Sequence, residues 1–349
     1  MNENFLGLNG FIWFVGVVED RADPLEAGRV RVRILGTHDK DKNILPTSYL
    51  PWAQCLLPTT SAGISGIGFS PSRLVEGSWV MGYFKDGRTR QDPFVIGSIP
   101  GYSKELSDGL GFSDPNQIYP KFANESDVSR LGRSGEEHSS LTSRKAARIT
   151  GIPTADFDAI ENATADDGTS WSQPAISAAP SYPYNSVMET ESGHILEFDD
   201  TTGVERIHLY HKIGSSIELL EDGSRVDIIK NNNYTLTSGN NAVYIQGNSD
   251  VTLNGRHKIY INKSATAGND YTIQVGAGAN VNIQVDNGDC NIHTRNGTMN
   301  LIAGNDFNLK VKGNMNVECD GTKTETVSGS STFNTVGAVT VTGSTIDLN

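Results

Sequence analysis

Apolar and polar residues alternate with a period of two through the first hundred residues, a pattern typical of β-strands with one buried face. Five short runs show this alternation, and turn residues separate them: FIWFVGVVED, RVRVRIL, YLPWAQCLL, SWVMGYF and PFVIGSI. Five short strands in so compact a stretch fit a small closed barrel of the OB type. The sequence therefore predicts an OB-type barrel over residues 1–101.

The alternation is lost between residues 102 and 185, where Pro, Ser, Ala and Asp dominate. Only a short helix near Ser139–Ile149 is expected in this segment, and we interpret the rest as an extended linker. Glu136, Glu137 and His138 could indicate acid–base chemistry, but they fall in a charged run with no identifiable partner. A solvated loop is the favoured interpretation of that run.

Short strand-like runs return from Ser186 to the end of the chain, and glycine punctuates them at a fixed interval. Glycine occupies positions 239, 247 and 255, then 313, 321, 329 and 337, with steps of eight residues. An eight-residue unit is one strand plus a turn, and such a strand cannot bury its apolar face without neighbours. The economical arrangement has three chains that each supply one side, so we expect an all-β chain whose residues 186–349 form a trimeric triple-stranded β-helix, or β-prism.

Composition and charge narrow the possible partners. The 37 glycines and the hydrophobic share of 36% favour short strands and turns over a helical bundle. The formal net charge of −13 opposes a surface that neutralises phosphates or lies on anionic lipid, so no nucleic acid is expected as a partner. Arg29, Arg31 and Arg33 could mark a basic groove on the barrel. Because acidic residues such as Asp20, Asp23 and Glu26 lie nearby in the sequence, pairing within the chain or protein docking is favoured instead.

Cysteine usage and the N-terminal residues bear on the compartment. Cys55, Cys290 and Cys319 are widely spaced and include no C-x-x-C, so they indicate neither a disulfide framework nor a zinc site. The first residues lack the features of a signal peptide, and no apolar run is long enough to span a membrane. These features predict synthesis in a reducing cytoplasm.

One cluster of polar residues could be taken for a metal site. It consists of His194, Glu197, Asp199, Asp200, His208 and His211. On a strand, residues three apart such as His208 and His211 point to opposite faces, so they cannot easily reach one ion. We therefore predict no metal, no cofactor and no catalytic residue, and interpret the cluster as polar residues at the start of the prism.

The most specific string in the chain is VMETESGHILEFDDTTGVERIHLYHKIGSSIELLEDGSRVDIIKNNN, residues 187–233. It resembles the start of the β-prism in the central spike proteins of contractile injection machines. These are the tail-associated lysozyme family of T-even-like phage baseplates and the valine-glycine repeat spikes of type VI secretion. WFVGVVEDRADPLEAGRVRVRILGTH and PFVIGSIPG in turn look like the OB domain of that family.

The resemblance implies partners and also shows two departures. The phage family carries a lysozyme domain between barrel and prism, whereas residues 102–185 are too few for one and hold no Glu…Asp…Thr arrangement that could supply its carboxylates. Type VI spikes fuse a hub module ahead of the barrel, which is not found here, so a separate trimeric hub protein is implied. The segment Gly343–Asn349 has no metal-binding cluster, so a small tip protein of the proline-alanine-alanine-arginine kind is implied at that end.

These observations together predict a non-enzymatic, homotrimeric central spike of a phage contractile-tail baseplate. It would dock on the hub and transmit the force of contraction to puncture the bacterial outer membrane. It would reside in the tail baseplate of the virion after assembly in the host cytoplasm. A spike of a type VI-like secretion system or of a phage-derived injection particle is the alternative, and a peptidoglycan hydrolase in residues 102–185 is a third.

Overall fold

The computed structural model describes residues 11–105, 110–113, 124–129, 131–134, 163–164, 170–171, 179–253, 255–261 and 270–347. The chain divides into two compact units, Met1–Lys258 and Ile259–Asn349. Each unit is considered by itself below. The helix expected near Ser139–Ile149 lies outside the described residues, as do Glu136, Glu137 and His138.

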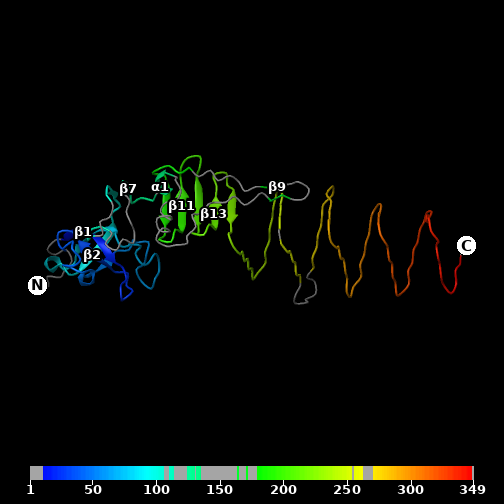
Figure 1. Ribbon diagram of the computed structural model, residues 1–349, viewed down its shortest axis with the longest axis horizontal. Helices are drawn as coiled ribbons and strands as arrows, with labels where there is room; N and C mark the ends of the chain where they lie inside the picture. The colour runs from blue at the N-terminus through cyan, green and yellow to red at the C-terminus, as the bar shows by residue number, and fades with distance from the viewer. Residues whose placement is uncertain are drawn as a thin grey trace. The chain divides into compact units, whose positions relative to one another are not determined.

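The first unit contains a closed five-stranded barrel, drawn in blue and cyan in Figure 1. Its strands are β1 (Ile12–Asp20), β2 (Val30–Ile34), β3 (Trp52–Cys55), β4 (Trp79–Phe84) and β5 (Pro93–Ser98). They close in the order β1-β2-β3-β5-β4, with β4 paired to β1, and only the β3–β5 pair is parallel. The barrel predicted from the alternation is therefore confirmed.

Several short elements accompany the barrel. Two 3-10 turns, η1 (Thr47–Tyr49) and η2 (Gly87–Thr89), lie in its connections. After it come β6 (Tyr102–Ser103), which pairs with β7 (Glu125–Ser126), then α1 (Leu131–Ser134), and then β8 (Ala163–Thr164), which pairs with β9 (Ser170–Trp171).

The barrel core is made by the inward positions of the alternating strands. Its buried members are Phe14, Val18, Val30, Val32, Ile34, Ala53, Val80, Phe84 and Val95. Each fully buried side chain of this size contributes about 1.5–3 kcal/mol through removal from water. Gly82 is required for closure, because a Cβ there would collide with the carbonyl of Phe94 and the ring of Phe14.

A buried ion pair joins β1 to β2 on the side of the sheet opposite the apolar core, under the β2–β3 connection. Arg33 and Glu19 are both fully buried, and Arg33 Nη2 donates to Glu19 Oε2 at 3.1 Å. Arg33 also donates to the carbonyls of Asp39 and Leu45, and the Thr47 hydroxyl donates to Glu19 at 2.7 Å. The guanidinium and the carboxylate therefore exchange water for several fixed partners, which a buried pair needs to be tolerated.

The other two arginines of the RVRVR run are also paired within the chain. Arg29 Nη2 lies 2.6 Å from Asp23 Oδ1, and Arg31 Nη1 donates to the carbonyl of Thr47 at 2.8 Å. The hydrogen bond from Arg29 holds the pKa of Asp23 far below its usual range. The run is thus engaged in intrachain pairing, one of the two alternatives favoured from the sequence.

A second sheet follows in the same unit, drawn in green in Figure 1. It is an antiparallel meander of β10 (Asn185–Glu189), β11 (Ile195–Asp199), β12 (Arg206–Tyr210), β13 (Ser216–Leu219) and β14 (Arg225–Ile228), in sequence order. Glycines with positive φ lie in the turns between these strands, for example Gly203 at 82° and Gly223 at 83°. Side chains rarely adopt this backbone conformation, so the T-T-G and E-D-G triplets fix where the strands end.

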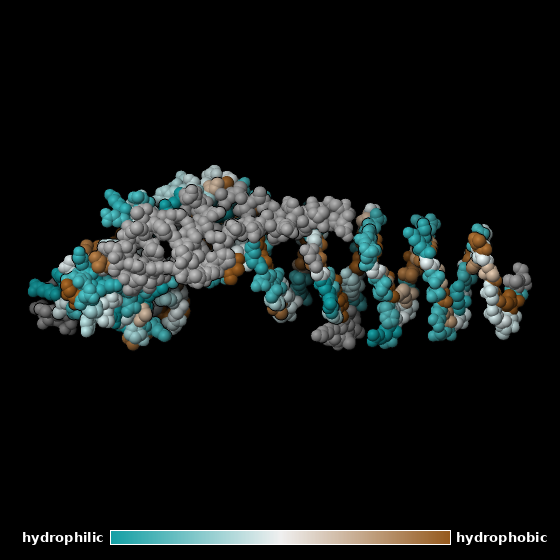
Figure 2. Space-filling model, viewed as in Figure 1, coloured by the Kyte–Doolittle hydropathy of each residue, from teal (hydrophilic) through white to brown (hydrophobic). Residues whose placement is uncertain are grey.

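The C-terminal unit is built differently. Its trace, yellow to red in Figure 1, runs to and fro, and its described residues, 259–261 and 270–347, form no strand pairs within the chain. Their side chains are exposed, and Figure 2 shows apolar residues, in brown, uncovered along the trace. The triple-stranded β-helix expected over residues 186–349 stays a prediction. Among the described residues, no helix is both long and apolar enough to cross a membrane.

The buried pair in the barrel gives a stability prediction. Arg33→Leu removes the guanidinium while Glu19 stays buried, so we expect the free energy of unfolding to fall by about 3–5 kcal/mol. The urea midpoint can be followed by tryptophan fluorescence, because Trp13, Trp52 and Trp79 lie on barrel strands.

Exposed Arg88 supplies the matched control, since Arg88→Leu should change stability by no more than about 0.5 kcal/mol. The double variant Glu19→Leu with Arg33→Leu should recover most of the loss, because it leaves no buried charge. Equal midpoints for Arg33→Leu and Arg88→Leu would contradict the prediction.

Candidate assembly surface on the second sheet

The two faces of the second sheet differ sharply in chemistry. One face carries two cross-strand rows of apolar residues, which we call the apolar face: Met188, Leu196, Leu209 and Ile217 in one row, and Phe198, Ile207 and Leu219 in the other. Six of the seven are exposed, for example Phe198 at 46% and Leu209 at 52%. Contiguous exposed apolar residues on this scale mark interaction surfaces, so the apolar face is a candidate assembly site.

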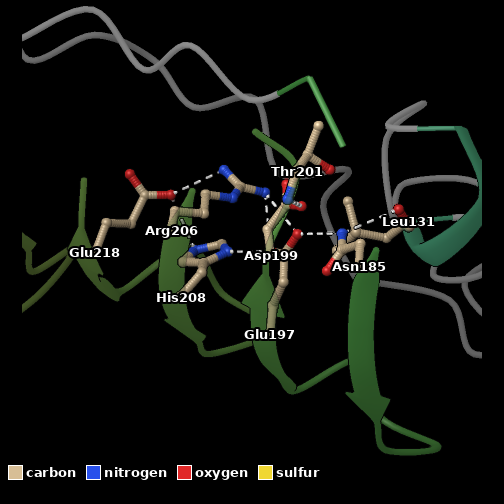
Figure 3. A network of polar contacts seen from close by, with 8 residues as sticks. All are labelled: Leu131, Asn185, Glu197, Asp199, Thr201, Arg206, His208 and Glu218. Carbon is tan, nitrogen blue, oxygen red and sulfur yellow. Dashed lines mark hydrogen bonds and ion pairs between the residues drawn. The ribbon is translucent and has the colours of Figure 1, made fainter. Parts of the chain in front are cut away.

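The opposite face is buried and carries a row of charged and polar side chains beside apolar ones such as Ile195 and Tyr210. Glu197, His208 and Glu218 are in register across β11, β12 and β13 and form what we call the polar row. Each is at most 1% exposed. His208 Nδ1 lies 3.2 Å from Glu197 Oε2, and His208 Nε2 lies 3.3 Å from Glu218 Oε1. The imidazole thus bridges two buried carboxylates (Figure 3).

Arg206 completes the polar row from the neighbouring position on β12. Its Nη2 donates to Glu197 Oε2 at 2.8 Å, and its Nη1 lies 3.4 Å from Glu218 Oε1 (Figure 3). Burial raises the pKa of Glu197, but the hydrogen bond with His208 and the charge of Arg206 outweigh this, and the pKa lies below its usual range. Glu197 is therefore an ionised carboxylate that depends on these two partners.

Asn185 connects the polar row to α1. Its amide Nδ2 donates to Glu197 Oε1 at 2.7 Å and to the carbonyl of Leu131 at 3.2 Å (Figure 3). The Leu131 side chain is buried in a small cluster with Ile195 and Tyr210 of the same sheet face. A segment more than fifty residues upstream therefore helps to cover the polar face.

The residues considered for a metal site fall into separate places. Glu197 and His208 join the polar row, where Arg206 already supplies a positive charge to the carboxylates. Asp199 accepts from the backbone N–H of Thr201 at 3.0 Å, and Asp200 is exposed. Among the described residues, no group of three or more His, Cys, Asp or Glu side chains is placed to hold a metal ion.

His194 and His211 instead form a pair at the end of the β11–β12 hairpin. Their ring centroids are 4.6 Å apart, and His208 lies elsewhere. His194 Nδ1 accepts from the backbone N–H of Lys212 at 3.4 Å, and His211 Nδ1 accepts from that of Ile213 at 3.3 Å. Burial lowers the pKa of His194, and the charges of His211 and Lys212 lower it further. The surroundings of His194 therefore favour its neutral ring.

The sequence did not predict the polar row, although a signal for it exists. Leu196 and Phe198 flank Glu197, Ile207 and Leu209 flank His208, and Ile217 and Leu219 flank Glu218. This alternation on three adjacent strands places all three polar residues on one face. If the strands are assumed to pair as consecutive hairpins, Glu197, His208 and Glu218 come opposite one another.

Comparison with known proteins finds two phage relatives and one domain family. The family model described as the Gp5 N-terminal OB domain matches residues 36–176, which include β3, β4 and β5. Protein Gp5 of Vibrio phage KVP40 is 38% identical over 270 residues, covering 68% of this chain and 62% of the relative. The pre-baseplate central spike protein Gp5 of Enterobacteria phage T4 is 44% identical over 135 residues, covering 37% of this chain and 23% of the relative. The matched region thus spans less than two thirds of either relative.

The histidine pair gives a pH prediction. Because the pKa of His194 is lowered in the folded protein, the unfolded chain binds more protons than the folded chain near and below the ordinary histidine pKa of about 6.5. Stability should therefore be complete above about pH 6.5 and decline as the pH falls below it. His38 contributes in the same direction, since burial lowers its pKa too.

Thermal melting between pH 7.5 and 5.5 checks this. His194→Asn keeps a hydrogen-bond acceptor near Lys212 and should reduce the loss of melting temperature on acidification. His293→Asn, a change at an exposed histidine of the C-terminal unit, is the control and should keep the full loss. The prediction is wrong if His194→Asn and His293→Asn lose melting temperature equally.

Proposed function

Since the chain is a relative of the Gp5 baseplate central spike proteins of T4-like phages, we propose that it is the structural central spike of a phage contractile-tail baseplate. The observation that carries this is the similarity itself, which extends over 270 residues to one phage Gp5. A baseplate location in the virion follows from the nature of these relatives, one of which is named a pre-baseplate central spike protein.

The spike is a homotrimer in this proposal. The apolar face leaves six large apolar side chains exposed in a single chain, and the C-terminal unit has no strand pairs among its described residues. If copies of the chain pack their apolar faces together and pair their C-terminal segments, the apolar side chains are buried and the C-terminal backbone gains strand partners. The eight-residue repeat favours three copies, one for each side of a prism.

The barrel docks on a trimeric hub protein, and an aromatic cluster on its outer surface is suited to the contact. This aromatic patch consists of Phe11, Trp13, Tyr83 and Phe94. Trp13, Tyr83 and Phe94 lie in register across β1, β4 and β5, and Tyr83 lies 5.0 Å from Phe11 and 5.6 Å from Trp13 between ring centroids. Phe11 is 44% and Trp13 52% exposed. Exposed aromatic residues that can be desolvated together are typical anchors of protein interfaces.

The role is mechanical rather than enzymatic. The relatives include a protein named as a spike, and the matching family model describes an OB domain. A rod of paired strands from three chains has no free edge along its length, so it can transmit the force of sheath contraction and puncture the outer membrane. A small tip protein covers its far end. A type VI-like or phage-derived injection particle is the alternative setting for the same rod, while the segment considered for a hydrolase lies mostly outside the described residues.

The trimer is tested by mass. Sedimentation should give three times 37.6 kDa, about 113 kDa, for the full chain. Leu209→Asp places a carboxylate in the middle of the apolar face, where it would be buried without a partner, so the mass should fall toward 37.6 kDa.

Leu25→Asp is the matched control, because Leu25 is 71% exposed in the β1–β2 connection of the barrel. It should leave the mass near that of three chains. Dissociation of both variants, or of neither, would show that the apolar face is not the assembly surface.

Hub docking is tested with the purified hub protein of the same phage. Trp13→Ser removes an anchor of the aromatic patch, and the affinity should fall by about 2 kcal/mol, or roughly thirtyfold, with the trimer mass unchanged. Tyr49→Ser, at an aromatic side chain that is 76% exposed elsewhere on the barrel, should keep the affinity. Equal affinities for these two variants would place the hub contact on another surface.

A further inference from the structure

Between residues 299 and 343 the main apolar positions recur every eight residues, as do the glycines at 313, 321, 329 and 337, and the odd-numbered positions share one side of the extended chain. In an extended backbone, residues two apart lie on the same face. The first position of each repeat is held by Met299, Phe307, Met315, Lys323, Ser331 and Val339. The second is held by Leu301, Leu309, Val317, Glu325, Phe333 and Val341. We call this side the column face.

One repeat places charged residues on the column face, whose first and second positions are otherwise apolar except at Ser331. Lys323 and Glu325 occupy the two positions that are Met315 and Val317 one repeat earlier. Their side chains point the same way, since Lys323 Nζ lies 3.5 Å from Glu325 Oε2. Val327 is the third odd position of this repeat and corresponds to Val311 two repeats earlier. Because an apolar residue returns at the expected position, the sequence gives no sign that the inward and outward faces exchange at this repeat.

Two buried charges in an apolar interior are destabilising unless each has a partner. If three copies pair with their column faces inward, as in the proposed rod, this repeat brings three ammonium groups and three carboxylates to one level. The ring is neutral overall, and each Lys323 can reach a Glu325 of a neighbouring copy as well as its own. The level is therefore tolerated only when all three copies present it together.

In a rod built from similar repeats, three copies could align in more than one register. A level of charged residues can select one of these registers. A shift of one copy by eight residues places Gly313, Gly321 and Gly329 level with the next glycine of the series and keeps most of the apolar contacts. It also moves Lys323 and Glu325 level with Met315 and Val317, or with Ser331 and Phe333, where they find no opposite charge. Single buried polar positions set register in coiled coils in the same way.

We propose that Lys323 and Glu325 are a register lock, a ring of alternating charges that aligns three copies of the chain; this rests on the proposed three-copy rod. The lock makes the in-register rod the lowest state among several that the glycine spacing alone would allow. Apolar contacts are lost at the level of Lys323 and Glu325, and in return only one alignment of the three copies is favoured.

Cys319 supplies a reporter of alignment in the full chain. It occupies the third odd position of the repeat just before the charged one, and it is exposed in the single chain. With Cys55 and Cys290 replaced by Ser, oxidation with copper phenanthroline can join only Cys319 of one copy to Cys319 of another. The yield of linked pairs on a denaturing gel therefore measures how often neighbouring copies are in register.

The decisive variant makes the charged repeat apolar, Lys323→Met with Glu325→Val, copying the residues of the repeat before it. The mass should stay near that of three chains, while the yield should fall by about threefold, as expected when shifts of −1, 0 and +1 repeats become equally populated. Lys323→Glu alone should lower the yield and the mass by repulsion, and adding Glu325→Lys should restore both. Lys310→Met, a change on the opposite side of the extended chain, is the matched control and should preserve the yield.

The outcomes separate the two levels of inference. A trimer whose Cys319 yield is the same in the parent, the apolar variant and the single charge reversal overturns the register lock and leaves the proposed spike standing. A parent chain with the mass of one copy overturns the rod and the lock together.

Discussion

The hydrogen-bonding groups of a β-strand require another strand on each side, and the three parts of this chain meet that requirement to different degrees. The barrel meets it fully, because β4 returns to β1 and closes the sheet. The second sheet meets it inside the meander, but among the described residues β10 and β14 each pair on one side only. The C-terminal unit has no pairs among its described residues and depends on other chains in the proposed rod.

Buried charge appears in both folded parts, and in each case it joins strands that are neighbours in the sheet. Arg33 and Glu19 connect β2 to β1, and His208 and Arg206 connect β12 to its two neighbours. Such groups contribute little net stability compared with apolar side chains of the same size. They penalise any other strand alignment, because a slipped partner would leave a charge without its counterpart. A protein made of many similar short strands has particular need of that discrimination.

The sequence predicted the barrel well because every signal there is local. Alternation placed Phe14, Val18 and Val32 inward, and turn residues marked where the strands end. It could not show which face of the second sheet is buried in a single chain, since that depends on Leu131, a residue 54 positions before Asn185. The contact of His194 with His211 likewise follows from the pairing of Ile195 with Tyr210, a register that spacing alone does not reveal. The sequence therefore separates His208 from His211, but it does not reveal that His208 contacts Glu197 and Glu218 or that His211 contacts His194.

The uncovered apolar face also has a consequence for synthesis. In the proposed trimer, each newly made chain would carry Leu209 and its neighbours open to water until other copies arrive, so completion of the fold would depend on concentration as well as on time. The barrel can close during translation, whereas the C-terminal unit of the proposed rod would pair its strands only after finished chains meet. Slow supply of chains would prolong a state that is vulnerable to proteases and to wrong associations. Polysomes that hold several copies close together would shorten that interval.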